Sequence, residues 1–207
     1  MKLRFIKFFI VVFAIIFSLL NGRFVYANLK YWLLVGPVPI AGWQNNNPQG
    51  LPISTEREVP VLSNQATIKI QRLGVTAPIV FDVGSDLKDV YNNLENGTVH
   101  YSSSPKPGAK GASVILGHSS AYPWYKGAYG SVFALLGKLN PGDVISIEYS
   151  NGQKFTFLVK QSILFSPFTD DSRLTEIEKS SSSSIVLVSC WPIGTDYKRI
   201  AIHAELI

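Results

Sequence analysis

Apolar and polar positions follow the pattern of short β-strands from Thr67 to the end of the chain. Most segments alternate between the two kinds of residue, whereas Ile185–Val188 is apolar throughout, as expected of a strand with both faces buried. Ser150-Asn151-Gly152 is a hairpin signal between two such segments. Pro78 indicates an edge or a bulge in the first strand region. The predicted strands cover 68–81, 112–116, 144–149, 154–165, 185–188 and 200–206.

Helical spacing interrupts this pattern at three places. Ser85-Asp86 reads as a helix start, and apolar residues then recur from Leu87 to Leu94. A second helix is predicted over Val132–Leu139, and a short acidic one before the serine run Ser180–Ser184, which we interpret as a loop. Many short strands with few helices predict a mostly antiparallel β-barrel.

The first 27 residues predict a signal or a membrane anchor. Three basic residues, Lys2, Arg4 and Lys7, precede Phe8–Leu20, which only Ser18 interrupts. Val25-Tyr26-Ala27 suits cleavage of a signal peptide, whereas a retained anchor needs about 20 apolar residues. Both alternatives stay open. In either case the basic start remains cytoplasmic and the rest of the chain lies outside the cytoplasm, at the cell membrane or secreted after Ala27.

Length and composition divide the remainder into a tether and one domain. Residues 36–66 contain five prolines and three glycines without periodicity, which is typical of a chain without regular structure. We therefore expect a signal or anchor over 1–27, an extracytoplasmic tether over 28–66 and a single folded domain over 67–207.

The charge distribution argues against a nucleic-acid partner. The chain has 19 basic and 14 acidic residues, but five of the basic ones lie within residues 1–30, which contain no acid. The remaining 14 basic residues balance the 14 acidic ones, so the predicted domain has no basic surface for DNA or RNA. A single cysteine also excludes an internal disulfide and a cysteine-rich zinc module.

That cysteine, Cys190, follows the buried strand and precedes Trp191-Pro192. Most free cysteines are small core residues, and this alternative remains open. Outside the cytoplasm, however, an unpaired thiol is an oxidation liability, which favours a reactive role at a strand end. A nucleophilic thiol needs a base or a cationic neighbour, because the thiolate is the attacking species.

Three histidines could supply that neighbour. We expect His203 to be surface-exposed, since alternation along the last strand places it opposite the apolar face. We expect His100 to be a polar residue with a hydrogen-bond partner, or a peripheral binding group. His118 differs, because it follows a strand and Gly117 and leads into Ser119-Ser120. Without a partner it is an ordinary loop histidine.

Arg199 supplies a third element. It opens the last strand, nine positions after Cys190, and the connecting segment contains Pro192 and Gly194. A loop of this length can bring the arginine beside the thiol, where its fixed donors suit a substrate carbonyl or an oxyanion. Alternatively it is a solvated arginine at the start of a strand.

This ordered set resembles the sortases, cysteine transpeptidases that attach proteins to the bacterial cell surface. The matching segments are Leu116–Ser120, Leu136–Asp143, Leu187–Pro192 and Lys198–Leu206. The resemblance covers Thr67–Ile207, and the Cys-Trp-Pro sequence looks most like class D. It implies a closed eight-stranded barrel with a few short helices and the catalytic residues Cys190, His118 and Arg199. Ser189, Ser119 and Trp191 are the expected substrate-binding residues.

The resemblance also implies partners. They are secreted proteins with a C-terminal, Leu-Pro-x-Thr-Gly-like sorting signal and an amine acceptor on the cell wall or a pilin. Val186 stands where the family pattern has a hydroxyl residue, so the recognised signal is expected to differ from the standard Leu-Pro-x-Thr-Gly. No cofactor is expected; some sortases bind calcium, but we interpret Asp170, Asp171, Glu176 and Glu178 as a solvated face and predict no metal.

Other functions remain open. A thiol hydrolase would use the same residues but pass the thioester to water. An L,D-transpeptidase also uses Cys and His, but Ser189-Cys190 lacks the glycine expected before its cysteine. A non-catalytic anchored β-domain would keep Cys190 in its core.

Overall fold

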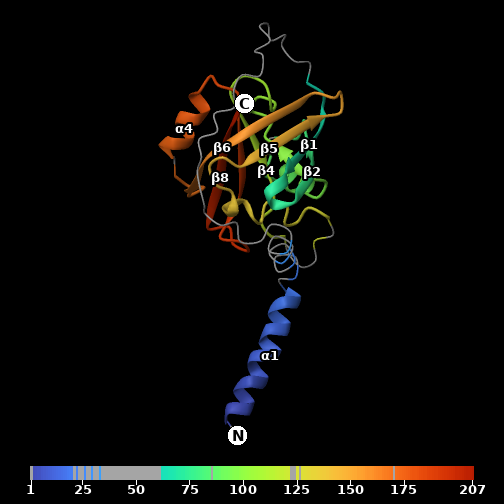
Figure 1. The fold of residues 1–207 in the computed structure, drawn as a ribbon, viewed down its shortest axis with the longest axis vertical. Coiled ribbons are helices and arrows are strands. Elements are labelled where there is room, and N and C mark those ends of the chain that lie inside the picture. The colour runs from blue at the N-terminus through green and yellow to red at the C-terminus, as the bar shows by residue number, and fades with distance from the viewer. Residues whose placement is uncertain are drawn as a thin grey trace.

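The computed structural model contains a closed barrel of eight strands (Figure 1). It describes residues 2–20, 22, 26, 29, 33, 62–84, 86–121, 125, 127–169 and 171–207. The order around the barrel is β1-β2-β3-β4-β7-β8-β6-β5. The strands are β1 (Gln65–Ile70), β2 (Val75–Val80), β3 (Thr98–His100), β4 (Ala112–Leu116), β5 (Val144–Tyr149), β6 (Lys154–Phe165), β7 (Ser184–Trp191) and β8 (Lys198–Leu206). Closure leaves no free sheet edge.

The observed strands largely confirm the predicted ones, except that one predicted strand region is divided into two strands. The segment 68–81 forms two antiparallel strands joined by the 3-10 turn η1 (Gln71–Leu73), where Gly74 adopts a left-handed φ of 62°. Pro78 can lie in β2 because the short β3 pairs only with Ile79 and Val80. The backbone of Pro78 is therefore outside that ladder and needs no N–H there.

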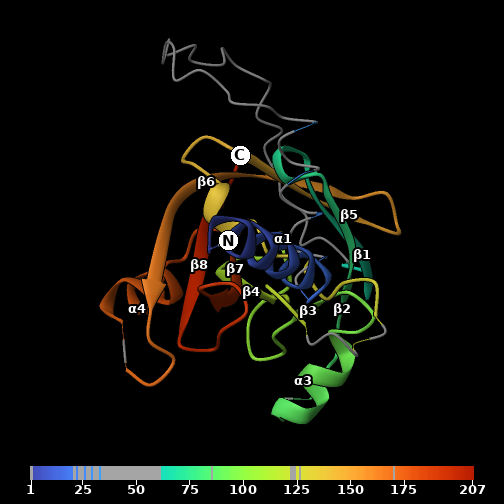
Figure 2. The same cartoon turned by 90° about the horizontal axis from the view of Figure 1, so that it is seen from below.

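Short helices cover two sides of the barrel. Helix α3 (Leu87–Asn93) connects β2 to the parallel β3, and α4 (Ser172–Lys179) lies beside β6 and β8 (Figures 1 and 2). Both confirm predicted helices. The Asp171 side chain caps α4 by accepting a hydrogen bond from the Arg173 N–H.

The N-terminal helix α1 (Lys2–Leu20) exposes most of its apolar side chains. Within the described residues, no helix combines the length and the apolar character needed to cross a membrane. The predicted cleavage site at Ala27 and most of the predicted tether lie outside the described residues.

The inward-facing residues of the strands form the main core. Ile68, Ile147, Phe157, Leu187 and Ile202 are among its fully buried members. Each such side chain contributes about 1.5–3 kcal/mol of burial free energy. Two smaller clusters lie outside the barrel wall, one under α4 and one under α3.

Two sequence predictions are wrong. The segment 132–139 is not an α-helix but a series of turns ending in the 3-10 turn η2 (Leu136–Lys138). Phe133 and Leu136 are buried in the main core, so packing and not helical periodicity sets this backbone. His203 is buried rather than exposed, with 8% of its surface accessible. It lies on the outer face of β8, next to Ala201 and Val186, which belong to the cluster that α4 covers.

Candidate active site

Cys190 and Arg199 are directly opposite each other. Cys190 lies near the end of β7, Arg199 near the start of β8, and the two are paired in the antiparallel register. Directly opposed residues share a face of the sheet, with Cβ atoms about 4.5–5.5 Å apart. Cys190 is also two residues from Val188, which packs in the cluster under α4. The thiol therefore lies on the outer face of the barrel, where it is partly exposed.

His118 lies two residues beyond the end of β4, the strand on the other side of β7. Strands β4 and β7 are parallel, with Leu116 paired to Val188, and the Gly117 N–H donates to the Val188 carbonyl. His118 and Cys190 each stand two residues beyond that pair. The fold thus brings together the three residues predicted to be catalytic, although 71 residues lie between the histidine and the cysteine in the sequence. Their chemical roles stay predictions.

Gly117 fixes the backbone before His118 through close packing. A Cβ atom at Gly117 would lie 2.3 Å from Cδ2 of the buried Phe133 ring, so only glycine fits. The Phe133 N–H donates to the His118 carbonyl at 2.9 Å. The Ser189 hydroxyl donates to the Gly117 carbonyl at 2.7 Å. The Ser189 bond joins the segment that leads to His118 to β7, the strand that carries Cys190.

Two tyrosine rings flank the His118 imidazole. The ring centroid of Tyr91 on α3 is 6.3 Å away, and that of Tyr125 is 5.3 Å away in an edge-on arrangement. The Tyr125 hydroxyl donates to the Leu94 carbonyl at 2.9 Å. Burial lowers the pKa of the His118 imidazole below its ordinary value, and the negative charge of Glu95 raises it to a smaller extent.

The Arg199 guanidinium bonds to the backbone of its own loop. Its Nη1 donates to the carbonyls of Asp196 and Lys198 at 2.8 and 3.0 Å. Among the described residues, no protein acceptor meets the other guanidinium N–H groups, so these donors are available to a substrate. Lys198 lies over the Tyr197 ring and is exposed.

The predicted substrate-binding residues occupy different environments. Ser189 and Ser119 are each 3% exposed. Trp191 packs against the main core, with its ring against Gly137. Their role in substrate binding stays a prediction, and for Ser189 the observed bond to Gly117 gives the hydroxyl a structural partner. His100 is buried, and its Nε2 bonds to the Pro105 carbonyl at 3.0 Å, which favours the satisfied polar residue over the peripheral binding group.

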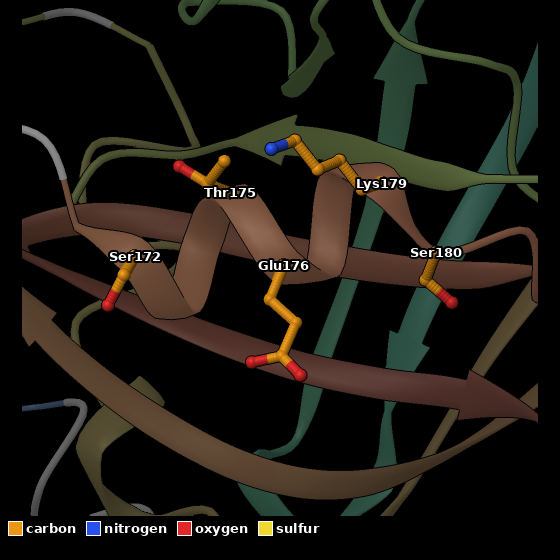
Figure 3. A pocket seen from close by; sticks show the side chains of 5 residues that line it. All are labelled: Ser172, Thr175, Glu176, Lys179 and Ser180. Carbon is orange, nitrogen blue, oxygen red and sulfur yellow. The ribbon is translucent and has the colours of Figure 1, made fainter.

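A hollow of about 830 Å³ lies against α4, and none of these site residues lines it. The residues that line it all project from α4 or directly follow it (Figure 3): Ser172, Thr175, Glu176, Lys179 and Ser180. It contains neither thiol nor imidazole, so we do not assign the active site to it. Among the residues that the structure describes, no three His, Cys, Asp or Glu side chains are grouped as metal ligands would be, and Asp170 lies outside them.

Sequence reasoning missed Tyr91, Tyr125 and Phe133 as neighbours of the site. Tyr91 belongs to the helical pattern of α3 and Phe133 to a wrongly predicted helix. Tyr91 and Phe133 are distant from His118 in the sequence, and Tyr125, seven residues after the histidine, belongs to no periodic pattern that relates it to His118.

Comparison with known proteins agrees with this geometry. The sortase domain family model matches residues 68–207. Sortase A from Corynebacterium diphtheriae has a similar structure, with a TM-score of 0.55, 26% identity and coverage of 72% of this chain and 62% of that one. No curated protein matches the sequence.

Two further solved structures share the fold. Sortase C1 of GBS pilus island 1 has a TM-score of 0.56 and 21% identity over 70% of this chain and 64% of its own. Sortase C-1 from Actinomyces oris has a TM-score of 0.55 and 23% identity over 69% of this chain and 72% of its own. The chain thus spans less than two thirds of the length of the first two relatives. These structures are of sortases A and C, so the class D assignment stays a prediction. From the match over residues 68–207, this chain belongs to the sortase family.

Proposed function

We propose that the protein is a cysteine transpeptidase that cleaves a sorting signal and transfers the acyl group to an amine. The observation that carries this proposal is the pairing of Cys190 with Arg199 across β7 and β8, with His118 two residues beyond the end of β4, which pairs with the other side of β7. A nucleophile, a proton donor and fixed hydrogen-bond donors thus come from three adjacent strands, which rigid pairing holds in place.

In the first half-reaction, the Cys190 thiolate attacks the carbonyl carbon of a threonine-like residue in the signal. Arg199 donates hydrogen bonds to the developing oxyanion or to the substrate backbone. The tetrahedral intermediate collapses, the C–N bond breaks, and His118 gives its proton to the departing amine. The products are a thioester on Cys190 and a released C-terminal peptide.

In the second half-reaction, an amine attacks the thioester carbonyl. His118, now neutral, accepts the proton of the attacking nitrogen, and Cys190 leaves as thiolate. Because burial lowers the pKa of His118, the imidazolium needed in the first half-reaction is a minority form at neutral pH. We therefore expect only a fraction of the molecules to hold a thiolate and an imidazolium together.

The proposed substrates are secreted proteins with a C-terminal signal of the Leu-Pro-x-Thr-Gly kind. The proposed acceptor is an amine of a cell-wall precursor or a pilin lysine. We propose that the domain acts outside the cytoplasm at the cell membrane. The exposed apolar side chains of α1 support membrane attachment, and the basic residues that precede them support a cytoplasmic N-terminus.

Intact mass spectrometry tests the activity. The full chain in detergent is incubated with a library of sorting-signal peptides, with and without an amine acceptor, beside the Cys190→Ala variant. A thioester adduct and an amine-capped product in the wild type alone support the proposal and identify the signal. Survival of acyl transfer in Cys190→Ala would refute it.

The same experiment separates the alternatives. Released acid without an amine-capped product identifies a thiol hydrolase, in which water takes the place of the amine. No adduct together with a slowly alkylated thiol identifies a non-catalytic β-domain. Separately, the position of α1 is tested by cell fractionation and by the mass of the mature protein, which distinguishes a retained anchor from cleavage after Ala27.

A further inference from the structure

Two aromatic contacts of His118 have no part in the proposed chemistry. Tyr91 approaches the imidazole from α3, and Tyr125 approaches from the loop that follows the histidine. Both centroid distances lie within the range of about 4.5–7 Å in which aromatic rings attract one another. The imidazole of a general acid must keep one orientation, because proton transfer requires hydrogen-bond distance to the reacting nitrogen.

The two rings are tied to the same element. The Tyr125 hydroxyl donates to the Leu94 carbonyl, directly after α3, and Tyr91 lies one turn earlier on that helix. Helix α3 is anchored on the barrel wall, since Val90 and Leu94 belong to one buried cluster with Val99. The rings therefore rest on a fixed support, whereas His118 itself lies beyond the last paired residue of β4.

Tyr91 is the informative member of the pair. Its side chain is 56% exposed, so burial of the ring in the core does not account for its position. An exposed ring beside a half-buried imidazole covers one side of that imidazole from water. Among charged groups, Glu95, two residues beyond the end of α3, acts on the His118 imidazole, while Cys190 and Arg199 lie on β7 and β8, the two strands that follow β4 around the barrel.

We propose that Tyr91 and Tyr125 are positioning residues that hold the His118 ring against the end of β4, with the Tyr125–Leu94 hydrogen bond fixing the pair to α3. This inference rests on the proposed role of His118 as proton donor. The tyrosines act through the histidine, and neither needs to contact the reacting atoms.

The test uses the full chain with Tyr91→Ala, Tyr91→Phe, Tyr125→Ala and Tyr125→Phe, and Tyr101→Ala as the matched control. Tyr101 is a partly exposed tyrosine outside the His118 contacts. Two quantities are measured: kcat/KM for acyl transfer, and the titration of each histidine by NMR, with the His118 signal assigned from its loss in His118→Asn.

We expect Tyr91→Ala to lower kcat/KM by about 3- to 10-fold, the effect of losing one ring contact, and Tyr125→Ala to lower it further, because that variant also loses the bond to Leu94. The His118 titration should move upward toward its ordinary value, because water then reaches the imidazole. Tyr91→Phe keeps the ring and should retain both properties. Tyr125→Phe should lower the rate by about 3- to 10-fold, since it keeps the ring and removes the bond to Leu94. Tyr101→Ala should change neither quantity.

Two results would overturn the inference. One is an unchanged His118 titration in both alanine variants. The other is a joint movement of the His100, His118 and His203 titrations, which would mean that the tyrosines only support the fold. The titration needs no turnover, so it judges the tyrosines even if the wild type transfers no acyl group; that outcome would count against the proposed function alone.

Discussion

Gly117→Ala tests whether close packing before the histidine sets the site. The backbone conformation itself allows alanine, since Gly117 is not among the glycines with positive φ. The obstacle is steric: the added methyl group would lie 2.3–2.8 Å from three carbons of the Phe133 ring, which is 1% exposed and has no room to move away. Inserting a methyl group into a packed core costs about 1–3 kcal/mol.

The expected result is a loss of both stability and activity. A chain of this size loses about 2–4 °C of Tm for each kcal/mol, so thermal unfolding should shift by several degrees. Acyl transfer should slow by up to about 100-fold, because a shift of the backbone at residue 117 also moves His118. A catalytic group misplaced by about 1 Å lowers the rate by about that factor. Gly22→Ala is the matched control, as its methyl group meets nothing within 4 Å.

A double-mutant cycle identifies the cause. Phe133→Leu alone should destabilise the core by leaving a cavity. If the clash is real, the combination with Gly117→Ala should cost less than the sum of the two single changes, because the smaller side chain leaves space for the methyl group. Additive losses, or a Gly117→Ala protein within about 0.5 kcal/mol of the wild type, would refute the steric reasoning.

Further predictions concern the neighbouring groups. Ser189→Ala should destabilise the fold by about 1–3 kcal/mol, because the Gly117 carbonyl loses its donor, while Ser189→Thr should retain the bond; chemical denaturation compares the three proteins. Burial lowers the pKa of His100 and His203, so the unfolded chain takes up protons first as the pH falls below about 6.5. Unfolding free energy should therefore decrease on acidification, by at most about 1.4 kcal/mol per pH unit for each histidine, and a flat profile from pH 7 to 5 would contradict this. Arg199→Gln should slow thioester formation by about 100- to 1,000-fold, measured by single-turnover mass spectrometry, and a rate within threefold of the wild type would exclude Arg199 as an oxyanion donor.

The sequence by itself determined the strands and the three residues that lie together. Alternation at 112–116 and 144–149, and the hairpin signal at Ser150-Asn151-Gly152, depend on local spacing and on turn chemistry, which the fold keeps. The approach of Arg199 to Cys190 also followed from the chain, because eight intervening residues limit how far the two strand ends can separate.

Only the tertiary structure decided the burial of outer-face residues and the surroundings of His118. Alternation says which face of β8 carries His203, but not that α4 returns to cover it. Helical periodicity over 132–139 was outweighed by the burial of Phe133 and Leu136 in the barrel. Tyr91 meets His118 because α3 crosses between two parallel strands, a contact between distant segments that only strand pairing creates. Local spacing fixes which face a side chain takes, whereas packing between elements fixes what that face meets.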